Sequence, residues 1–372
     1  MSQENSVLKR YSEGAQSVQA ELCCPVDYDA TLLKQLPQEI IDKDYGCGDP
    51  SRYVKENDIV LDLGSGSGKI CYIAAQLVGP QGKVIGIDMN DDMLALARKY
   101  QPEMAEKLAG NRVQFLKGQI QDLALDCNAL DDYLTQHPVQ STQTLMACRD
   151  WQEQQRLLKP LIADNSIDLV ISNCVLNLVS EHDKQKMIDE IFRVVKPGGR
   201  IAISDIVSDE PPSETMKSDP HLWSGCISGA LQEHDFLHAF IEAGFAAVKL
   251  DVWSNTPWQV VENIEFRSTT VTAIKPEQTP CLDKGHAVIY RGPFSEVYDD
   301  DGHIYPRGQR IATCERTFNL LTNGGPYQDE FIGITPAQLK PAQPWCTPAG
   351  TLRPASESKG GEHRAPTIDP CC

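Results

Sequence analysis

The chain has 372 residues, a formal net charge of −18, 41% hydrophobic residues and 13 cysteines. This length predicts two domains, or one large domain with a smaller one beside it. The acidic charge disfavours nucleic-acid binding, which depends on attraction to phosphate, and the sequence has no apolar run long enough to cross a bilayer, so we expect no membrane partner.

The first 50 residues carry cysteines but no targeting signal. Residues 1–5 lack a basic region followed by an apolar stretch, so we expect a cytoplasmic protein. In that compartment most thiols stay reduced, and an odd number of cysteines cannot all pair within one chain. We predict that residues 1–50 form a cap segment ahead of the main fold, which carries Cys23, Cys24 and Cys47.

Expected strands and helices alternate from residue 51 to residue 255. The strands are apolar runs at residues 58–63, 83–87, 113–118, 167–171 and 200–204, and the helices between them include residues 71–78, 93–97 and 183–194. This alternation predicts an α/β fold with a parallel, doubly wound sheet that binds its ligand at the carboxyl ends of the strands. The polar residues 121–165 have helical stretches, which indicates an insertion at the sheet edge.

The alternation of strands and helices ends near residue 256. Residues 266–274, 287–291 and 311–314 are rich in β-branched residues, so we predict a small β-rich domain over residues 256–340. Proline, glycine, serine and charged residues dominate residues 341–372, which we expect to be a disordered tail ending in two cysteines.

A glycine-rich turn follows the first expected strand. Its sequence, Asp-Leu-Gly-Ser-Gly-Ser-Gly from Asp62 to Gly68, resembles the first motif of class I S-adenosylmethionine-dependent methyltransferases. Glycine lets the backbone turn sharply and approach a ligand closely. Asp88, 20 residues beyond Gly68, is placed to accept hydrogen bonds from ribose hydroxyls. A nicotinamide dinucleotide fingerprint fits less well, because Lys69 stands where it requires glycine.

Two cysteines accompany the later strands. Cys174 directly follows the fourth expected strand, and Cys226 lies in a Gly-Cys-Ile-Ser-Gly segment beyond the fifth. Two thiols at the ligand-binding edge suggest a soft, thiophilic substrate. Zinc fits less well, because the sequence has no Cys-x-x-Cys pair. Either cysteine could instead be a small buried hydrophobe.

The motifs together resemble the arsenite S-adenosylmethionine methyltransferases. Tyr-Gly-Cys-Gly at residues 45–48, the glycine turn, Ser-Asn-Cys at residues 172–174 and Gly-Cys at residues 225–226 carry this resemblance. It is closest to the microbial branch, which includes enzymes associated with arsenosugar formation. The resemblance implies three functional thiols, Cys174 and Cys226 as arsenic(III) ligands and Cys47 as the third. It further implies that Cys23 or Cys24 forms a disulfide with Cys47 during turnover.

The same resemblance implies the other participants in the reaction. These are S-adenosylmethionine as methyl donor, arsenite or its thiol conjugates as substrate, and glutathione or thioredoxin as reductant of a monomeric enzyme. Gln119 and Ile120 occupy the usual place of the adenine contact, although a polar residue at a strand end can also be merely structural. The implied cofactor contacts are Tyr45, Gly46, Asp62, Gly64, Gly66, Asp88, Met89, Gln119, Ile120 and Asn173.

The expected reaction needs no general base, because the arsenic lone pair can itself attack the sulfonium methyl once both are positioned. Two alternatives remain open. The acceptor could be another small thiophile such as a thiol or selenide, or the chain could be a non-catalytic metalloid-binding protein. Lys69 and Ile70 also differ from the arginine and aspartate of many family members, so the contacts of that pair cannot be assumed here.

Overall fold

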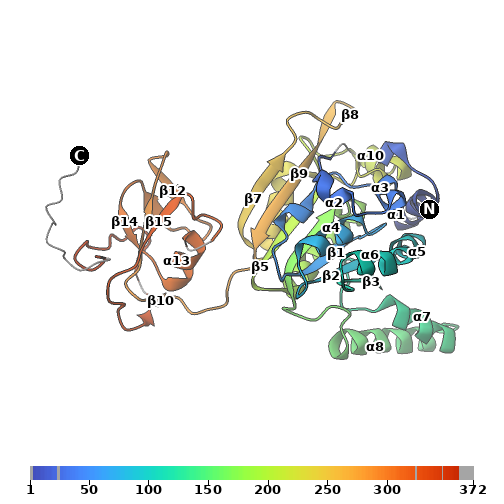
Figure 1. Ribbon diagram of the computed structural model, residues 1–372, viewed down its shortest axis with the longest axis horizontal. Helices are drawn as coiled ribbons and strands as arrows, with labels where there is room; N and C mark the ends of the chain where they lie inside the picture. The colour runs from blue at the N-terminus through green and yellow to red at the C-terminus, as the bar shows by residue number, and fades with distance from the viewer. Residues whose placement is uncertain (1–2, 23–25, 323–324, 346, 360–372) are drawn as a thin grey trace. The chain divides into compact units, whose positions relative to one another are not determined.

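The computed structural model describes residues 3–22, 26–322, 325–345 and 347–359 (Figure 1). The chain divides into two compact units, Met1–Pro276 and Glu277–Cys372. This boundary lies some residues beyond the predicted start of the C-terminal domain at residue 256. None of the helices in the described part of the chain is long and apolar enough to cross a membrane.

The first unit is built on a nine-stranded sheet with the order β3-β2-β1-β4-β5-β9-β7. Its parallel part confirms the predicted class I methyltransferase fold, because β1 pairs in parallel with β2 and β4, β2 with β3, and β4 with β5. These strands are β1 Ile59–Leu63, β2 Lys83–Asp88, β3 Val113–Lys117, β4 Ile167–Asn173 and β5 Val195–Ser208.

The other edge of the sheet corrects the predicted domain boundary. β9 (Ile264–Ile274) pairs antiparallel with β5, and β7 (Ala246–Trp253) pairs antiparallel with β9. The β-rich stretch assigned to the C-terminal domain therefore belongs to the central sheet, where Val271 lies in the hydrophobic core. The short strands β6 (Leu231–Gln232) and β8 (Gln259–Val261) add to β5 and β9.

Helices cover both faces of this sheet, as the doubly wound pattern requires. One hydrophobic cluster contains residues of α9 and α12, and the other contains residues of α4 and α5. The long helices are α1 Gln3–Gln16, α4 Lys69–Leu77, α5 Asp91–Lys99, α9 Glu181–Val194 and α12 Glu233–Glu242. The short ones are α2 Ala30–Leu33, α3 Gln38–Asp42, α6 Gln101–Lys107, α10 Glu214–Lys217 and α11 Pro220–Ser224.

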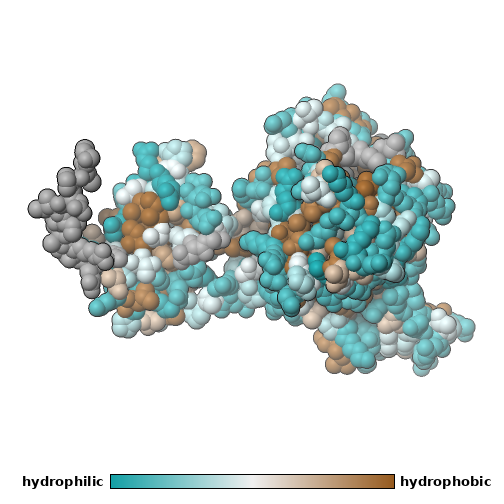
Figure 2. All heavy atoms as spheres, in the orientation of Figure 1, coloured by the Kyte–Doolittle hydropathy of each residue, from teal (hydrophilic) through white to brown (hydrophobic). Residues whose placement is uncertain are grey.

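The segment between β3 and β4 contains two helices, α7 (Cys127–Gln136) and α8 (Thr142–Leu158), in the region where helical stretches were predicted. Tyr133 and Trp151 stack between them with ring centroids 4.5 Å apart. Hydrophobic side chains remain on the surface of this insertion (Figure 2), since Leu157 and Leu158 are exposed.

The second unit is β-rich, as predicted. Its main sheet has the order β14-β11-β15 and packs against α13 around a core that includes Val288, Tyr305 and Phe318. Its elements are β10 Leu282–Asp283, β11 Ala287–Tyr290, β12 Glu296–Tyr298, β13 Ile304–Pro306, β14 Arg310–Ala312, α13 Glu315–Leu321, β15 Phe331–Ile334 and β16 Gln343–Pro344.

The prediction of a disordered tail is wrong for the described residues of that stretch, 341–345 and 347–359. There, β16 pairs with β10, and the buried guanidinium of Arg353 lies 2.7 Å from a carboxylate oxygen of Asp283. Composition alone concealed these specific contacts. Cys346, Cys371 and Cys372 lie outside the described residues.

Candidate active site

The glycine turn has the backbone conformation that its sequence requires. Gly64, Gly66 and Gly68 have φ angles of 67°, 49° and 84°, a region that side chains disfavour. A Cβ atom on Gly66 would have no neighbour within 4 Å, so the loop faces open space at that point. The Gly66 amide donates a 2.8 Å hydrogen bond to a carboxylate oxygen of Asp88, which ties the turn to the end of β2.

A cavity opens beside this turn, at the carboxyl ends of β1, β2 and β4. Nine of the predicted cofactor residues line it, namely Tyr45, Gly46, Asp62, Gly64, Gly66, Asp88, Met89, Ile120 and Asn173. Gln119 is not among the lining residues, whereas its neighbours Ile120 and Gln121 are. The lining also includes Leu8 and Tyr11 of α1, which the sequence analysis missed because helix periodicity in α1 carries no ligand-binding signal.

Two carboxyl groups, the buried Asp62 and the half-buried Asp88, give this cavity an acidic wall. Burial raises the pKa of Asp62 to about 7, opposed by a hydrogen bond from the Cys71 thiol and reinforced by Asp44 and Asp88. Burial also raises the pKa of Asp88, although backbone amides of Asn90 and Gly66 bond to it. A positively charged ligand would relieve this cost, since an opposite charge stabilises the carboxylate form.

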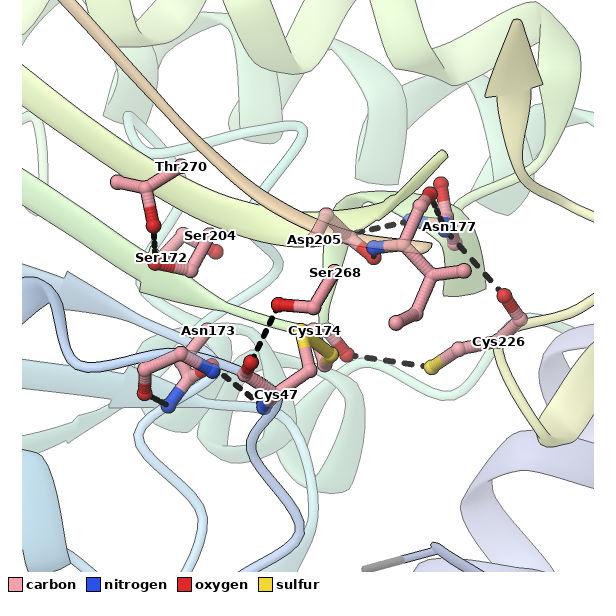
Figure 3. Close-up of a disulfide and its surroundings, with 12 residues drawn as sticks. Cys47, Ser172, Asn173, Cys174, Asn177, Ser204, Asp205, Cys226, Ser268 and Thr270 are labelled. Carbon is pink, nitrogen blue, oxygen red and sulfur yellow. Dashed lines mark hydrogen bonds between the residues drawn. A yellow bond between two sulfur atoms is a disulfide. The ribbon is translucent and has the colours of Figure 1, made fainter. Parts of the chain in front are cut away.

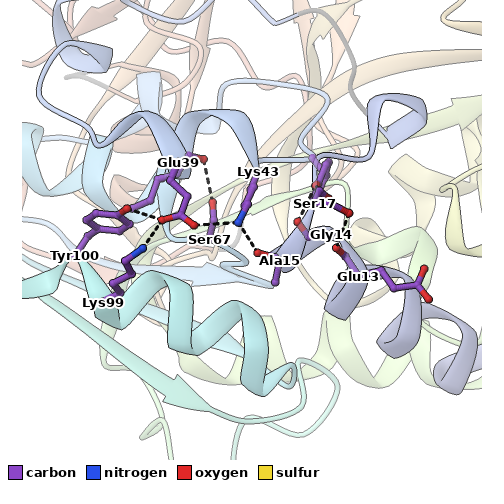
Figure 4. Close-up of polar contacts among 11 residues, drawn as sticks. Glu13, Gly14, Ala15, Ser17, Glu39, Lys43, Ser67, Lys99 and Tyr100 are labelled. Carbon is purple, nitrogen blue, oxygen red and sulfur yellow. Dashed lines mark hydrogen bonds and ion pairs between the residues drawn. The ribbon is translucent and has the colours of Figure 1, made fainter.

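Polar contacts hold the N-terminal segment beside the glycine turn (Figure 4). Lys43 donates to the carbonyl of Ala15 at 2.7 Å and pairs with Glu39 at 3.0 Å. Glu39 also accepts from Lys99 and Tyr100 at the end of α5, and hydrogen bonds from these groups lower its pKa to about 2. Residues of the predicted cap segment thereby form part of the cavity wall.

Cys47, Cys174 and Cys226 form a thiol cluster (Figure 3), and Cys174 also lines the cavity. Cys174 directly follows β4, and its sulfur forms a disulfide with Cys47. The thiol of Cys226 lies against the same loop, donating to the Cys174 carbonyl at 3.4 Å. Cys174 and Cys226 have φ angles of 58° and 61°, an uncommon conformation for residues other than glycine that often marks functional sites. All three cysteines are buried, and they pack among apolar side chains such as Ile206 and Phe266.

The family resemblance implied a disulfide of Cys47 with Cys23 or Cys24, whereas in the structure Cys47 forms a disulfide with Cys174. Cys23 and Cys24 lie outside the described residues, so their predicted role stays a prediction. The three cysteines predicted to act together lie together, with Cys47 and Cys174 joined in a disulfide and the Cys226 thiol beside them.

Asn173 connects the cavity with the thiol cluster. Its side-chain oxygen accepts from the backbone amides of Cys47 and Gly48 at 2.9 and 3.0 Å, and its amide nitrogen donates to the Gly48 carbonyl at 2.8 Å. A Cβ atom on Gly46 would stand 2.1 Å from this amide group. The Tyr-Gly-Cys-Gly motif thus needs glycine at residue 46, because Asn173 fills the space and positions Cys47.

Asp205 is a member of the site that the sequence analysis missed. One of its carboxylate oxygens and the sulfurs of Cys47 and Cys174 all lie within 4.8 Å of one another. The carboxylate is fully buried, and it accepts from the amides of Ile206 and Asn177 at 2.8 and 3.3 Å. Burial raises the pKa of Asp205 to about 6. Its location directly after the predicted fifth strand, residues 200–204, was the available signal.

The fold and the site define a class I S-adenosylmethionine-dependent methyltransferase, and comparison with known proteins agrees. A family model described as a methyltransferase domain matches residues 54–244, and one described as a domain of unknown function matches residues 277–363. The chain is 31% identical over 316 residues to an arsenite methyltransferase of Aquipseudomonas alcaligenes, covering 81% of each protein. It is 31% identical to that of Rattus norvegicus, covering 84% of this chain and 77% of the relative.

A solved structure shows the same likeness. The X-ray structure of an arsenic(III) S-adenosylmethionine methyltransferase from Chlamydomonas reinhardtii matches with a TM-score of 0.56 and 27% identity, covering 83% of this chain and 96% of that one. The chain belongs to the arsenite methyltransferase family.

Proposed function

We propose that this protein transfers the methyl group of S-adenosylmethionine to trivalent arsenic held by Cys174, Cys226 and Cys47. One observation carries most of the proposal, namely that Cys174 belongs both to the thiol cluster and to the lining of the cavity. A soft atom bound to its sulfur would stand at the boundary of the donor site, where the methyl group must pass.

The residues of the cavity fit the methyl donor. When bound, S-adenosylmethionine supplies an electrophilic methyl on a sulfonium sulfur, and transfer leaves S-adenosylhomocysteine. Gly66 leaves a space that a side chain would fill, and Asp88 stands where ribose hydroxyls can donate to it. The buried carboxyl group of Asp62 and the half-buried one of Asp88 suit a cationic ligand.

The thiols must be reduced before arsenic can bind, because both sulfurs of the disulfide are occupied. Glutathione or thioredoxin would supply the two electrons and two protons, as the reducing cytosol allows. The thiols of Cys47, Cys174 and Cys226 then replace the hydroxyl groups of arsenite, releasing water and keeping arsenic trivalent. Thiolates suit this soft centre, and a buried apolar pocket excludes competing water. We propose that the enzyme acts as a monomer.

The Cys47–Cys174 pair also completes the electron balance. When the arsenic lone pair becomes an arsenic–carbon bond, arsenic is formally pentavalent. The arsenic–sulfur bonds to Cys47 and Cys174 break, and their sulfurs join as the disulfide that the structure contains, which gives arsenic two electrons and returns it to the trivalent state. Hydroxide from water takes the vacated position, and a second water releases the methylarsenical from Cys226. Exchange with Cys23 or Cys24 would then free Cys174, and reduction of the new Cys47 disulfide by glutathione or thioredoxin would restore all three arsenic ligands.

The test uses purified, reduced full-length protein with S-adenosylmethionine, glutathione and arsenite, followed by speciation of the products. We expect methylated arsenicals, with S-adenosylhomocysteine formed in equal amount per methyl group. Parallel reactions offer selenide or a small organic thiol in competition. Preferential methylation of either competitor, with arsenite left unchanged, would refute arsenic as the acceptor.

A further inference from the structure

A second pair of cysteines lies in the C-terminal unit, outside the site described above. We propose that Cys281 and Cys314 form a dithiol site for a trivalent organoarsenical, an arsenic atom with one carbon substituent and two exchangeable ligands. The natural ligand class rests on the proposed function, because a monomethylated arsenical is its product. Dithiol binding itself does not depend on that reaction.

Several contacts place the two cysteines together. Cys281 directly precedes β10, Cys314 directly precedes α13, and α13 packs against β10. The two thiols are close enough to influence each other, since burial and the neighbouring Cys314 thiol both raise the pKa of Cys281. The neighbouring ion pair between Lys284 and Glu315, at 2.6 Å, holds the same two segments side by side. The pairing of the thiols is thus part of the packing of this unit.

The two thiols differ in accessibility. Cys314 is buried, and its sulfur lies 3.3 Å from the hydroxyl of Thr317. Cys281 is half-buried, and its carbonyl accepts a 2.9 Å hydrogen bond from the Trp345 amide, which fixes its backbone. A ligand can therefore reach Cys281 from solvent first and then close onto a thiol that is already held in place.

The number of ligands favours an organoarsenical over a metal ion. Zinc in structural sites takes four ligands, and inorganic arsenite offers three exchangeable positions. In the described part of the chain, the one cluster of three or more histidine, cysteine or acidic side chains close enough to share an ion is Cys47, Cys174 and Asp205. Two thiols match an arsenical with two hydroxyl groups. Two arsenic–sulfur bonds form, two arsenic–oxygen bonds break, and two waters leave without oxidation or reduction.

The binding test uses phenylarsine oxide with reduced full-length protein and no S-adenosylmethionine. The parent variant carries serine in place of Cys23, Cys24, Cys47, Cys174, Cys226, Cys371 and Cys372, which removes the adjacent cysteine pairs and the thiol cluster of the first unit as competing sites. We expect one arsenical bound per chain, and Cys281→Ser or Cys314→Ser added to this parent should weaken binding by about 100-fold, because chelation becomes single attachment. Cys127→Ser, a half-buried cysteine of the first unit, is the matched control and should change nothing. Unchanged affinity in both single variants would overturn the site.

A second measurement does not depend on the folding of any variant. After the unsubstituted protein binds phenylarsine oxide, proteolysis and mass spectrometry should recover an arsenic bridge between the peptides that contain Cys281 and Cys314. Bridges confined to other cysteine pairs would contradict the proposal. The initial rate of arsenite methylation should be unchanged in Cys281→Ser. An arsenic bridge between Cys281 and Cys314 without any arsenite methylation would refute only the proposed function. Arsenite methylation without this bridge would refute only the dithiol site.

Discussion

The two halves of the active site differ in their chemical surroundings. The donor half, at the ends of β1 and β2, contains the buried carboxyl group of Asp62 and the half-buried one of Asp88 beside an open glycine turn. The acceptor half, at the ends of β4 and β5, contains three buried cysteines packed among apolar side chains. A polar, acidic half suits a charged ligand, whereas a dry half rich in sulfur suits a soft metalloid.

This difference implies that the two halves can be damaged separately. Asn173 is the residue that belongs to both, because it lines the cavity and also bonds to the backbone of Cys47. Substitutions on either side should therefore give distinct binding defects, and a substitution of Asn173 should affect both.

The largest effect is expected for Cys174→Ser. A hydroxyl is a poor ligand for trivalent arsenic, so arsenite methylation should fall at least ~1000-fold as the positioned acceptor is lost. Calorimetry should show unchanged S-adenosylmethionine affinity. Cys148→Ser, equally buried but on α8, is the control and should retain activity. Full activity in Cys174→Ser would disprove the acceptor assignment.

Asp88→Asn should damage the donor half instead. Loss of the charged acceptor at the end of β2 should weaken S-adenosylmethionine binding by about 100-fold, the range for removing a hydrogen bond to a charged group. Arsenite binding to the reduced thiols, followed by its ultraviolet absorption, should stay the same. Asp92→Asn on α5 is the control for a nearby change of charge. Equal loss of arsenite binding would show that the halves are not separable.

Asn173→Ala should affect both halves by a smaller amount. It leaves the amides of Cys47 and Gly48 without their acceptor, which should cost about 2 kcal/mol and lower the methylation rate about 30-fold. Both S-adenosylmethionine and arsenite binding should weaken in calorimetry. The exposed Asn111→Ala serves as control. Weaker binding of only one of the two ligands would show that Asn173 does not connect the two halves.

The smallest effect concerns pH. The pKa of Asp62 is about 7 in the fold against an ordinary 3.8, so the folded state binds more protons and this residue's contribution to stability falls as pH rises from about 4 to about 7. A cationic ligand favours the ionised form, so S-adenosylmethionine affinity should rise about tenfold from pH 6 to pH 8. Asp62→Asn should flatten both profiles in calorimetry and thermal unfolding, and Asp92→Asn should keep them. A pH-independent affinity in the unsubstituted protein would count against an ionising Asp62.

The donor half was predictable because its signal is local. The glycine turn and Asp88 follow strands whose periodicity is plain, and positive φ angles explain the glycines directly. The acceptor half joins Cys47 and Cys174, which are 127 residues apart, so spacing alone could not indicate their pairing. The family resemblance identified the functional thiols, but it implied a disulfide of Cys47 with Cys23 or Cys24 instead of Cys174.

Other features depended on tertiary contacts that no periodicity reveals. The alternating sequence of β9 fits a strand of either domain. Only its pairing with β5 places it in the central sheet. Asp205 lies within an apolar strand, and it meets the sulfurs of Cys47 and Cys174 only because the N-terminal segment and the loop after β4 both approach β5. Arg353 lies in a stretch with the composition of a disordered tail, although its guanidinium is buried against Asp283.

A single-turnover experiment tests the central claim most directly. Reduced protein receives one equivalent of arsenite and methyl-labelled S-adenosylmethionine, and acid quenching with thiol alkylation then records methylarsenic and disulfides by mass spectrometry. The account predicts that Cys47 enters a disulfide in step with methylarsenic formation, first with Cys174. Methylarsenic that accumulates while Cys47 is still alkylated as a thiol would contradict it.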